Sequence, residues 1–231
     1  MSTLLSIKNL TVAVGTKGIV NNVSFDVPQG KIVAIAGASG SGKTTIGLSI
    51  LRLLPSALSV KQGSIIFEDR NLLELSAEKM RQCRGERIGM VFQEPLSAFD
   101  PLFTVGLQCD EVLAAHTKLS KQERYKKVLD VFTEVELSDP PRVYESYPHQ
   151  LSGGMRQRAM VAQALVCGPS LIIADEPTSS LDITLQIKIM QLFSRLRKKN
   201  ISILLISHDL EMISHLADET VVLRQSLEAF Q

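Results

Sequence analysis

The stretch Gly37-Ala38-Ser39-Gly40-Ser41-Gly42-Lys43-Thr44 constrains the fold of this chain more than any other. The apolar residues 32–36 before it are typical of a buried strand, and residues 45–51 after it are predicted to continue as a helix that ends before Pro55. A strand, a glycine-rich turn that ends in Lys-Thr, and a helix together form the context of a phosphate-binding loop. The other interpretation, a chance glycine turn, does not account for the full match in that context.

Each residue type in this stretch has a reason to bind a nucleoside triphosphate. Gly37, Gly40 and Gly42 allow backbone angles that side chains forbid, so that successive N–H groups can point inward at a phosphate. The helix N-terminus adds the positive end of its dipole, Lys43 adds a full charge, and the Thr44 hydroxyl suits Mg²⁺. The residues predicted to contact the nucleotide here are Gly37, Ala38, Ser39, Gly40, Ser41, Gly42, Lys43, Thr44 and Thr45.

Length and charge narrow the class of protein. The chain has 231 residues, enough for one large domain or for a core with a subdomain. Its 25 Lys and Arg against 24 Asp and Glu leave no basic excess, which argues against a nucleic-acid binder. No apolar run approaches the ~18 residues of a membrane span, and we expect no signal peptide. Cys83, Cys109 and Cys167 are too far apart for a metal site, and we expect reduced thiols in a cytosolic protein.

The sequence also predicts a small β region on both sides of the loop. Residues 4–14 are predicted as an antiparallel edge strand, residues 20–27 as a second strand, and residues 63–69 as a strand with a turn. Residues 104–137 have a helical pattern, and their basic side chains, balanced by nearby acids, are interpreted as a solvated face rather than a nucleic-acid patch.

Three further apolar strands carry polar residues at their carboxyl ends. Residues 88–92 lead to Gln93, residues 171–174 to Asp175 and Glu176, and residues 201–206 to His208. Strands that alternate with helices favour a parallel sheet with right-handed crossovers, whose carboxyl edge is the ligand side. Asp175 can hold Mg²⁺, and Glu176 can accept a proton from an attacking water or orient it. A surface turn with acidic residues is the weaker interpretation.

Ser152-Gly153-Gly154 begins another predicted helix, in which Ser152 is a plausible N-cap. The two glycines leave the helix start bare for close approach by a ligand. An ordinary capped helix explains these residues equally well, so both interpretations stay open at this point.

In their order along the chain, these residues resemble the ATP-binding cassette family of transporter ATPases. The loop Gly37–Thr44, Gln93, the family signature at 151–157, the acidic pair after 171–174, the loop at 179–182 and His208 all match. The resemblance implies an α/β P-loop fold with a RecA-like parallel sheet core, an N-terminal antiparallel β subdomain and an α-helical subdomain. It also implies a single ATP-binding domain over 1–231, with the helical subdomain inserted at about 96–160.

The resemblance implies roles for these residues in an ATP hydrolase that works with ATP and Mg²⁺. Two cassettes would face each other head to tail, with Ser152, Gly153 and Gly154 of one on the γ-phosphate held by Lys43 of the other. Gln93 would help to ligate Mg²⁺ together with Thr44 and Asp175, and would report on the helical region that touches the membrane subunits. Glu176 would polarise water, His208 would hold the γ-phosphate, and Asp182 would signal across the dimer.

Two loops resemble one branch of the family. Residues 92–101 and 147–158 are similar to those of the dipeptide, oligopeptide and nickel importers. That branch implies a second, identical or related ATPase subunit, two integral membrane permeases and an external binding protein. The chain would act at the cytoplasmic face of the membrane as a peripheral subunit, without nucleic acid. The implied cargo is a peptide, nickel or a metal chelate.

The sequence departs from the family at two places. The family usually stacks an aromatic residue on adenine after the first strand, whereas Val12-Ala13-Val14 stands here, and we expect looser base selectivity. The chain stops at Gln231 with no glycine turn at Gln225-Ser226, where many relatives continue, so we expect a truncated or divergent end.

Two other functions would use part of the same set of motifs. An ABC-type ATPase that acts on nucleic acid or ribosomes would fit the motifs, but such relatives often carry two cassettes or a long insert. A P-loop kinase of a small molecule would leave the segment at 151–154 without a role.

Overall fold

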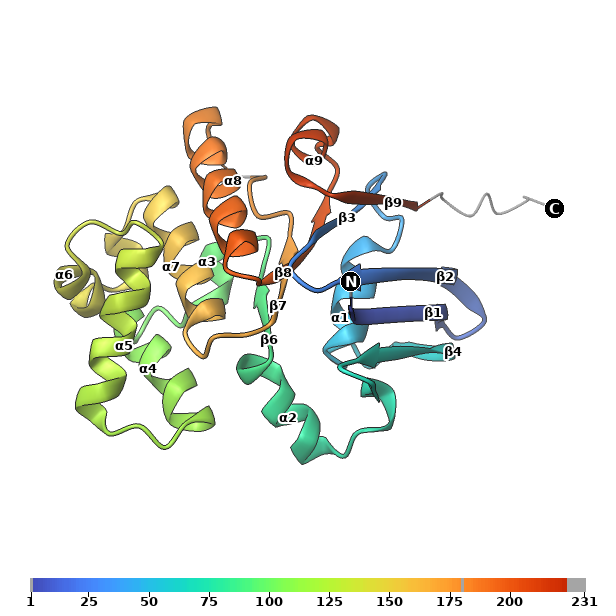
Figure 1. The fold of residues 1–231 in the computed structure, drawn as a ribbon, viewed down its shortest axis with the longest axis horizontal. Helices are drawn as coiled ribbons and strands as arrows, with labels where there is room; N and C mark the ends of the chain where they lie inside the picture. The colour runs from blue at the N-terminus through green and yellow to red at the C-terminus, as the bar shows by residue number, and fades with distance from the viewer. Residues whose placement is uncertain (1, 180, 224–231) are drawn as a thin grey trace. The chain divides into compact units, whose positions relative to one another are not determined.

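The structure, a computed structural model, describes residues 2–179 and 181–223. The chain divides into two compact units, which are called unit 1 (Met1–Arg81 with Leu196–Gln231) and unit 2 (Gln82–Arg195). Figure 1 shows the elements of both. The end of the chain after Leu223, including the predicted departure at 225–226, lies outside the described residues.

An antiparallel sheet forms one half of unit 1. It contains β1 (Thr3–Val14), β2 (Lys17–Pro28), β4 (Leu58–Phe67) and β5 (Arg70–Asn71) in the order β2-β1-β4-β5. The prediction that residues 4–14 form an edge strand is wrong, because β1 pairs with β2 on one side and β4 on the other (Figure 1). Its second partner begins at Leu58, where Ser59, Lys61 and Gln62 obscure the strand pattern, and only the long-range pairing reveals it.

Parallel strands form the other half of unit 1. Strand β3 (Ile32–Gly37), buried except at its last residue, lies between β8 (Ser202–Ser207) and β9 (Glu219–Leu223), and pairs in parallel with both. Helix α1 (Lys43–Ile50) contacts β8 and β2, and α9 (Leu210–Leu216) contacts β3. The short helix η1 (Leu72–Glu74) and α2 (Ala77–Glu86) follow the antiparallel sheet, and α2 runs into the start of unit 2.

Unit 2 combines two parallel strands with most of the helices. The strands are β6 (Ile88–Val91) and β7 (Leu171–Asp175). The helices are α3 (Pro95–Ala98), α4 (Val105–His116), α5 (Lys121–Glu134), α6 (Pro140–Glu145), η2 (Pro148–Gln150), α7 (Gly153–Leu165) and α8 (Ile183–Lys198), whose last turn enters unit 1. Helices α3 to α7 lie where the sequence predicts a helical subdomain, and the single-domain assignment stays a prediction.

The stretch predicted to be helical over 104–137 is two helices. Ser120 begins α5 with a capping box, in which its hydroxyl accepts from the N–H of Glu123 and the Glu123 carboxylate accepts from the N–H of Ser120. Arg124 then reaches back to Asp110 of α4, with a shortest N–O distance of 2.9 Å. The helical periodicity alone does not reveal this break, because α4 and α5 each bury one side of the helix.

The described residues were also expected to lack membrane-spanning helices, metal-ligand clusters and disulfides. None of their helices is both long and apolar enough to cross a membrane. Within the same residues, no three His, Cys, Asp or Glu side chains gather where they could hold a metal ion. Cys83, Cys109 and Cys167 form no disulfide. Burial together with the nearby Asp110 raises the pKa of Cys109.

The carboxylate of Asp218 fastens β3 to the segment before β9. It accepts hydrogen bonds from the Ile32 N–H at 2.9 Å, from Lys31 at 3.0 Å and from Arg197 at 3.2 Å. Burial raises the pKa of this carboxyl, but the bonds from Ile32, Lys31 and Arg197 outweigh burial and hold the pKa below its ordinary value of 3.8. The charged form is therefore the one that stabilises the fold.

We predict that Asp218→Asn lowers the free energy of unfolding by about 1 kcal/mol at neutral pH, because it removes a charged acceptor from a partly exposed network. Since the folded-state pKa is lowered, the difference between wild type and variant should be full above pH 3.8 and shrink as the pH falls through the lower folded-state pKa. Urea unfolding at neutral and acidic pH measures both values. A difference that stays constant into acid would contradict the assigned role.

Candidate nucleotide-binding site

The loop between β3 and α1 has the backbone that a phosphate cradle requires. Gly40 has φ +78° and Gly42 has φ +92°, so both lie in the left-handed region that favours glycine. A Cβ at Gly42 would also lie 2.9 Å from the carbonyl oxygen of Ile19. Gly37 is different: its φ is not positive, and it is small because a Cβ would lie 2.9 Å from the carbonyl oxygen of Leu223 in β9. The prediction that all three glycines serve unusual angles is thus wrong for Gly37.

Lys43 closes this loop upon itself. Its Nζ donates to the carbonyl oxygens of Gly37 at 2.8 Å and Ala38 at 2.9 Å, and the residue is only 7% exposed. Two of the three ammonium donors are thus used by the loop. The buried Ser41 Oγ has no hydrogen-bond partner among the described residues. A buried hydroxyl without a partner, beside a cation and two left-handed glycines, fits an anionic phosphate group.

The other predicted site residues of unit 1 lie on α1 and directly after β8. Thr44 is exposed and Thr45 is half-buried in the first turn of α1. His208 is exposed and directly follows β8. The next residue, Asp209, caps α9 by accepting from the Met212 N–H at 2.9 Å, and this cap fixes where the chain turns after His208.

In unit 2, the predicted acidic pair ends β7. Asp175 is the last strand residue and is 3% exposed. Glu176 has φ +46°, a left-handed backbone conformation that is uncommon outside glycine, asparagine and aspartate. The Glu176 carbonyl accepts from the N–H of Ser179 at 3.3 Å and from its hydroxyl at 3.1 Å. Strained backbone of this kind persists where surrounding contacts impose it, and it is common at functional sites.

The signature segment begins α7, as predicted. Ser152 is the N-cap, and its hydroxyl accepts from the Met155 N–H at 3.3 Å. Gly153 is exposed, and a Cβ there would meet no atom within 4 Å. Gly154 is buried instead, against the side chain of Leu185 in α8. Gln93 is exposed in the segment that follows β6.

The structure gives residues of unit 2 structural roles that the sequence did not indicate. Asp182 caps α8, since its carboxylate accepts from the Leu185 N–H at 2.9 Å. An aspartate directly before an amphipathic helix is a common N-cap, so the sequence could have predicted this role. The contact between Leu185 and Gly154, and the buried Gln157 Nε2 that has no partner among the described residues, had no such signal, because tertiary packing creates both.

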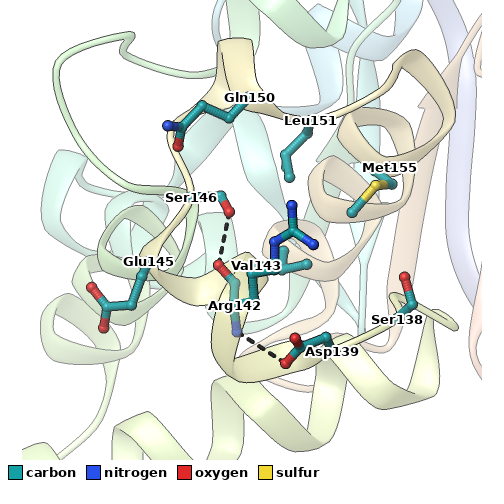
Figure 2. A pocket seen from close by; sticks show the side chains of 9 residues that line it. All are labelled: Ser138, Asp139, Arg142, Val143, Glu145, Ser146, Gln150, Leu151 and Met155. Carbon is teal, nitrogen blue, oxygen red and sulfur yellow. Dashed lines mark hydrogen bonds between the residues drawn. The ribbon is translucent and has the colours of Figure 1, made fainter.

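A pocket of about 430 Å³ borders the signature segment (Figure 2). It is lined by Ser138, Asp139, Arg142, Val143, Glu145, Ser146, Gln150, Leu151 and Met155. Figure 2 shows the Arg142 guanidinium pointing toward Leu151 and Met155, whereas Asp139 accepts from the Arg142 N–H as the cap of α6. The pocket thus has a mostly polar lining, with the Arg142 cation directed toward two apolar side chains beside the start of α7.

Comparisons with known proteins agree with this assembly of motifs. The family model described as ABC transporter matches residues 20–179. The dipeptide transport ATP-binding protein DppD of Bacillus subtilis is 44% identical over 96% of this chain and 68% of that protein. The oligopeptide transport ATP-binding protein OppD of the same organism is 39% identical over 95% of this chain and 63% of that protein. The chain therefore spans about two thirds of the length of these relatives.

Solved structures show the same fold. A dimeric structure of MJ0796, described as a bacterial ABC transporter cassette, has a TM-score of 0.84 at 29% identity and covers 96% of this chain and 94% of its own. A second MJ0796 structure, of a post-hydrolysis state bound to ADP and Pi, matches equally well. The predicted α/β P-loop fold, with its parallel strands and N-terminal antiparallel sheet, is confirmed. The chain belongs to the ABC transporter family and is an ABC-type ATPase of the peptide-importer branch.

Proposed function

We propose that this chain energises a di- or oligopeptide importer by hydrolysing ATP at sites shared between two cassettes. One observation carries the proposal: Gly153 is exposed at the capped start of α7, and nothing around it in the described chain requires a glycine. A glycine without an internal reason, at a helix N-terminus, favours close approach by a group from outside. The dimeric cassettes among the structural relatives support a second copy, or a related subunit, as the source of that group.

The Gly37–Thr44 loop is proposed to hold the phosphates of ATP. The inward N–H groups, the α1 N-terminus and Lys43 stabilise the negative charge, and the unpartnered Ser41 hydroxyl can donate to a phosphate oxygen. Mg²⁺ would be held by oxygens of Thr44, Gln93 and Asp175, and when bound it supplies charge neutralisation on the phosphates. The fit rests on the hard oxygen donors of these residues.

Glu176 and His208 are proposed to act on the γ-phosphate. Water attacks the γ-phosphorus, the bond from that atom to the bridging oxygen breaks, and ADP leaves with both bonding electrons. Glu176 orients the water and can accept its proton, while His208 donates a hydrogen bond to a γ-phosphate oxygen. The left-handed backbone at Glu176 sets the direction in which its side chain leaves the main chain, and this supports a role in which the carboxylate must be held in position.

Ser152, Gly153 and Gly154 are proposed to reach the γ-phosphate held by the other cassette. Each cassette then supplies one loop and one α7 N-terminus, and two nucleotides are enclosed when the pair closes. ATP favours the closed pair, and hydrolysis removes the shared phosphate contact and lets the pair open. That opening and closing is the motion proposed to drive transport.

The proposed attachment to membrane permeases rests on an apolar cluster in unit 2. Leu102 is 77% exposed and Phe103 44%, both just before α4, and Leu107 in the first turn of α4 is 37% exposed. The Val105 N–H donates to the Ser146 carbonyl at 2.9 Å, which brings the segment before the signature next to this cluster. Exposed apolar side chains in one place are typical of protein-binding surfaces. This supports a peripheral location at the cytoplasmic face of the membrane, with an external binding protein in the complex.

The names of the relatives support peptide cargo. Nickel and metal chelates, which the sequence left open, find no such support in the names of the relatives. Action on nucleic acid is not favoured either.

Lys43→Ala should weaken ATP binding on the order of tenfold or more, because the variant loses a buried cation and its charge-assisted hydrogen bonds. Calorimetric titration with ATP measures the affinity. Lys79→Ala, a change on α2, is the matched control and should bind as the wild type does. Equal affinities for all three proteins would remove the loop from the nucleotide site.

Glu176→Gln should lower kcat by about a hundredfold or more while ATP still binds, because the amide keeps the size of the side chain and loses its basicity. Steady-state phosphate release and ATP titration separate the two effects. Glu111→Gln on the exposed face of α4 is the control. Unchanged turnover in the Glu176 variant would remove it from the reaction.

Leu102→Glu with Phe103→Glu should detach the chain from permease-containing membranes without loss of ATP binding, because a charge replaces the apolar contact. Sedimentation with membranes that contain the permeases measures attachment. Leu53→Glu alters an apolar side chain of unit 1 that is 43% exposed and serves as the control. Retained sedimentation of the double variant would place the permease contact elsewhere.

A further inference from the structure

The surroundings of the two neighbouring signature glycines, Gly153 and Gly154, differ. Gly153 faces open space, but a Cβ at Gly154 would lie 2.7 Å from Cδ2 and 2.8 Å from Cδ1 of Leu185. Those distances are too short for any Cβ, so the Leu185 side chain occupies the place that a larger residue at 154 would need. The first turn of α8 therefore rests directly on the first turn of α7.

Leu185 is held in place by the loop before α8. Its N–H donates to the Asp182 carboxylate at 2.9 Å, which makes Leu185 part of the helix cap. The neighbouring Gln186 donates from Nε2 to the carbonyl oxygens of Thr178 at 3.3 Å and Leu181 at 3.2 Å. The loop and the first turn of α8 thus form one hydrogen-bonded piece.

The same piece reaches back to the strained residue after β7. Ser179 donates twice to the Glu176 carbonyl, and the Leu181 N–H donates to the Thr178 carbonyl at 3.1 Å. Hydrogen bonds and the peptide bonds between sequence neighbours therefore connect Glu176 through Thr178 and Ser179 to Leu181 and Asp182, and Leu185 connects Asp182 to Gly154. All of these residues belong to unit 2.

We infer that Leu185 is a positioning residue that couples the Glu176–Asp182 loop to the phosphate-contacting end of α7 in the same chain. The inference rests on the proposed function, in which Glu176 serves the nucleotide of its own loop and Gly154 serves the nucleotide of the other cassette. A single apolar side chain then links the two nucleotide sites. A shift of the loop at one site moves the α7 tip that completes the other.

Leu185→Ala should leave the first ATP bound as tightly as in the wild type, because the phosphate loop is untouched. It should lower kcat on the order of three- to tenfold and reduce the Hill coefficient for ATP, because the two sites lose a coupling contact of the size that neighbouring residues share. Leu185→Met, which keeps an apolar chain of similar volume, should restore both values. Ile187→Ala, an exposed change on the same helix, should have no effect.

A double-mutant cycle separates this role from direct ligand contact at Gly154. If Leu185 is the reason for the glycine, Gly154→Ala should lower kcat in the wild-type background and have much less effect in the Leu185→Ala background, where space has opened. If only the ligand requires the glycine, the two fold-losses multiply. Multiplying losses, or a Hill coefficient that Leu185→Ala leaves unchanged, would overturn the inference.

Failure of the proposed function would look different. A wild-type protein that binds ATP but never hydrolyses it, with the partner subunit and permeases present, would reject that function. The cycle measured by urea unfolding would then still report whether Leu185 and Gly154 are coupled. Additive changes in unfolding free energy would reject the contact itself.

Discussion

The bond of Lys43 to its own loop is the interaction around which unit 1 is arranged. Its ammonium holds the Gly37 and Ala38 carbonyls, while Gly40 and Gly42 turn the chain through left-handed conformations. Such a loop carries few stabilising contacts of its own, so its ends must be fixed. Buried β3 fixes one end between β8 and β9, and α1 fixes the other against β8 and β2. The carboxylate of Asp218 then accepts a hydrogen bond from Ile32 and holds the N-terminal end of β3.

Unit 2 also has two segments of the proposed site that other contacts must hold in place. In the proposed reaction, Glu176 and the start of α7 both present polar groups to a ligand, so contacts on their other sides must hold them in place. Ser179 and Gln186 hold the loop after Glu176, while Ser152 and Leu185 hold the start of α7. The two supports meet at Asp182, whose carboxylate caps α8. Preorganised groups of this kind act at little reorganisation cost, which is how phosphoryl transfer is usually accelerated.

Most of the fold and the identity of the candidate site could be predicted from the sequence because the signals are local. The phosphate loop, the apolar strands with polar ends and the Ser152 cap each depend on a few adjacent residues. The errors arose where the cause is distant. The β1 strand is internal because β4 starts early, at Leu58, and Gly37 is small because Leu223 of β9 lies against it. No pattern near residues 4–14 or 37 contains that information.

The sequence by itself therefore determined which residues are candidates to bind phosphate and order water and which can cap helices, because residue type fixes charge, hydrogen-bonding capacity and backbone freedom. The tertiary structure decided which of them support one another. Only packing separates exposed Gly153 from buried Gly154, and only packing brings Leu185 over the latter. Adjacent and identical residues acquired different roles because α8 covers one and leaves the other open.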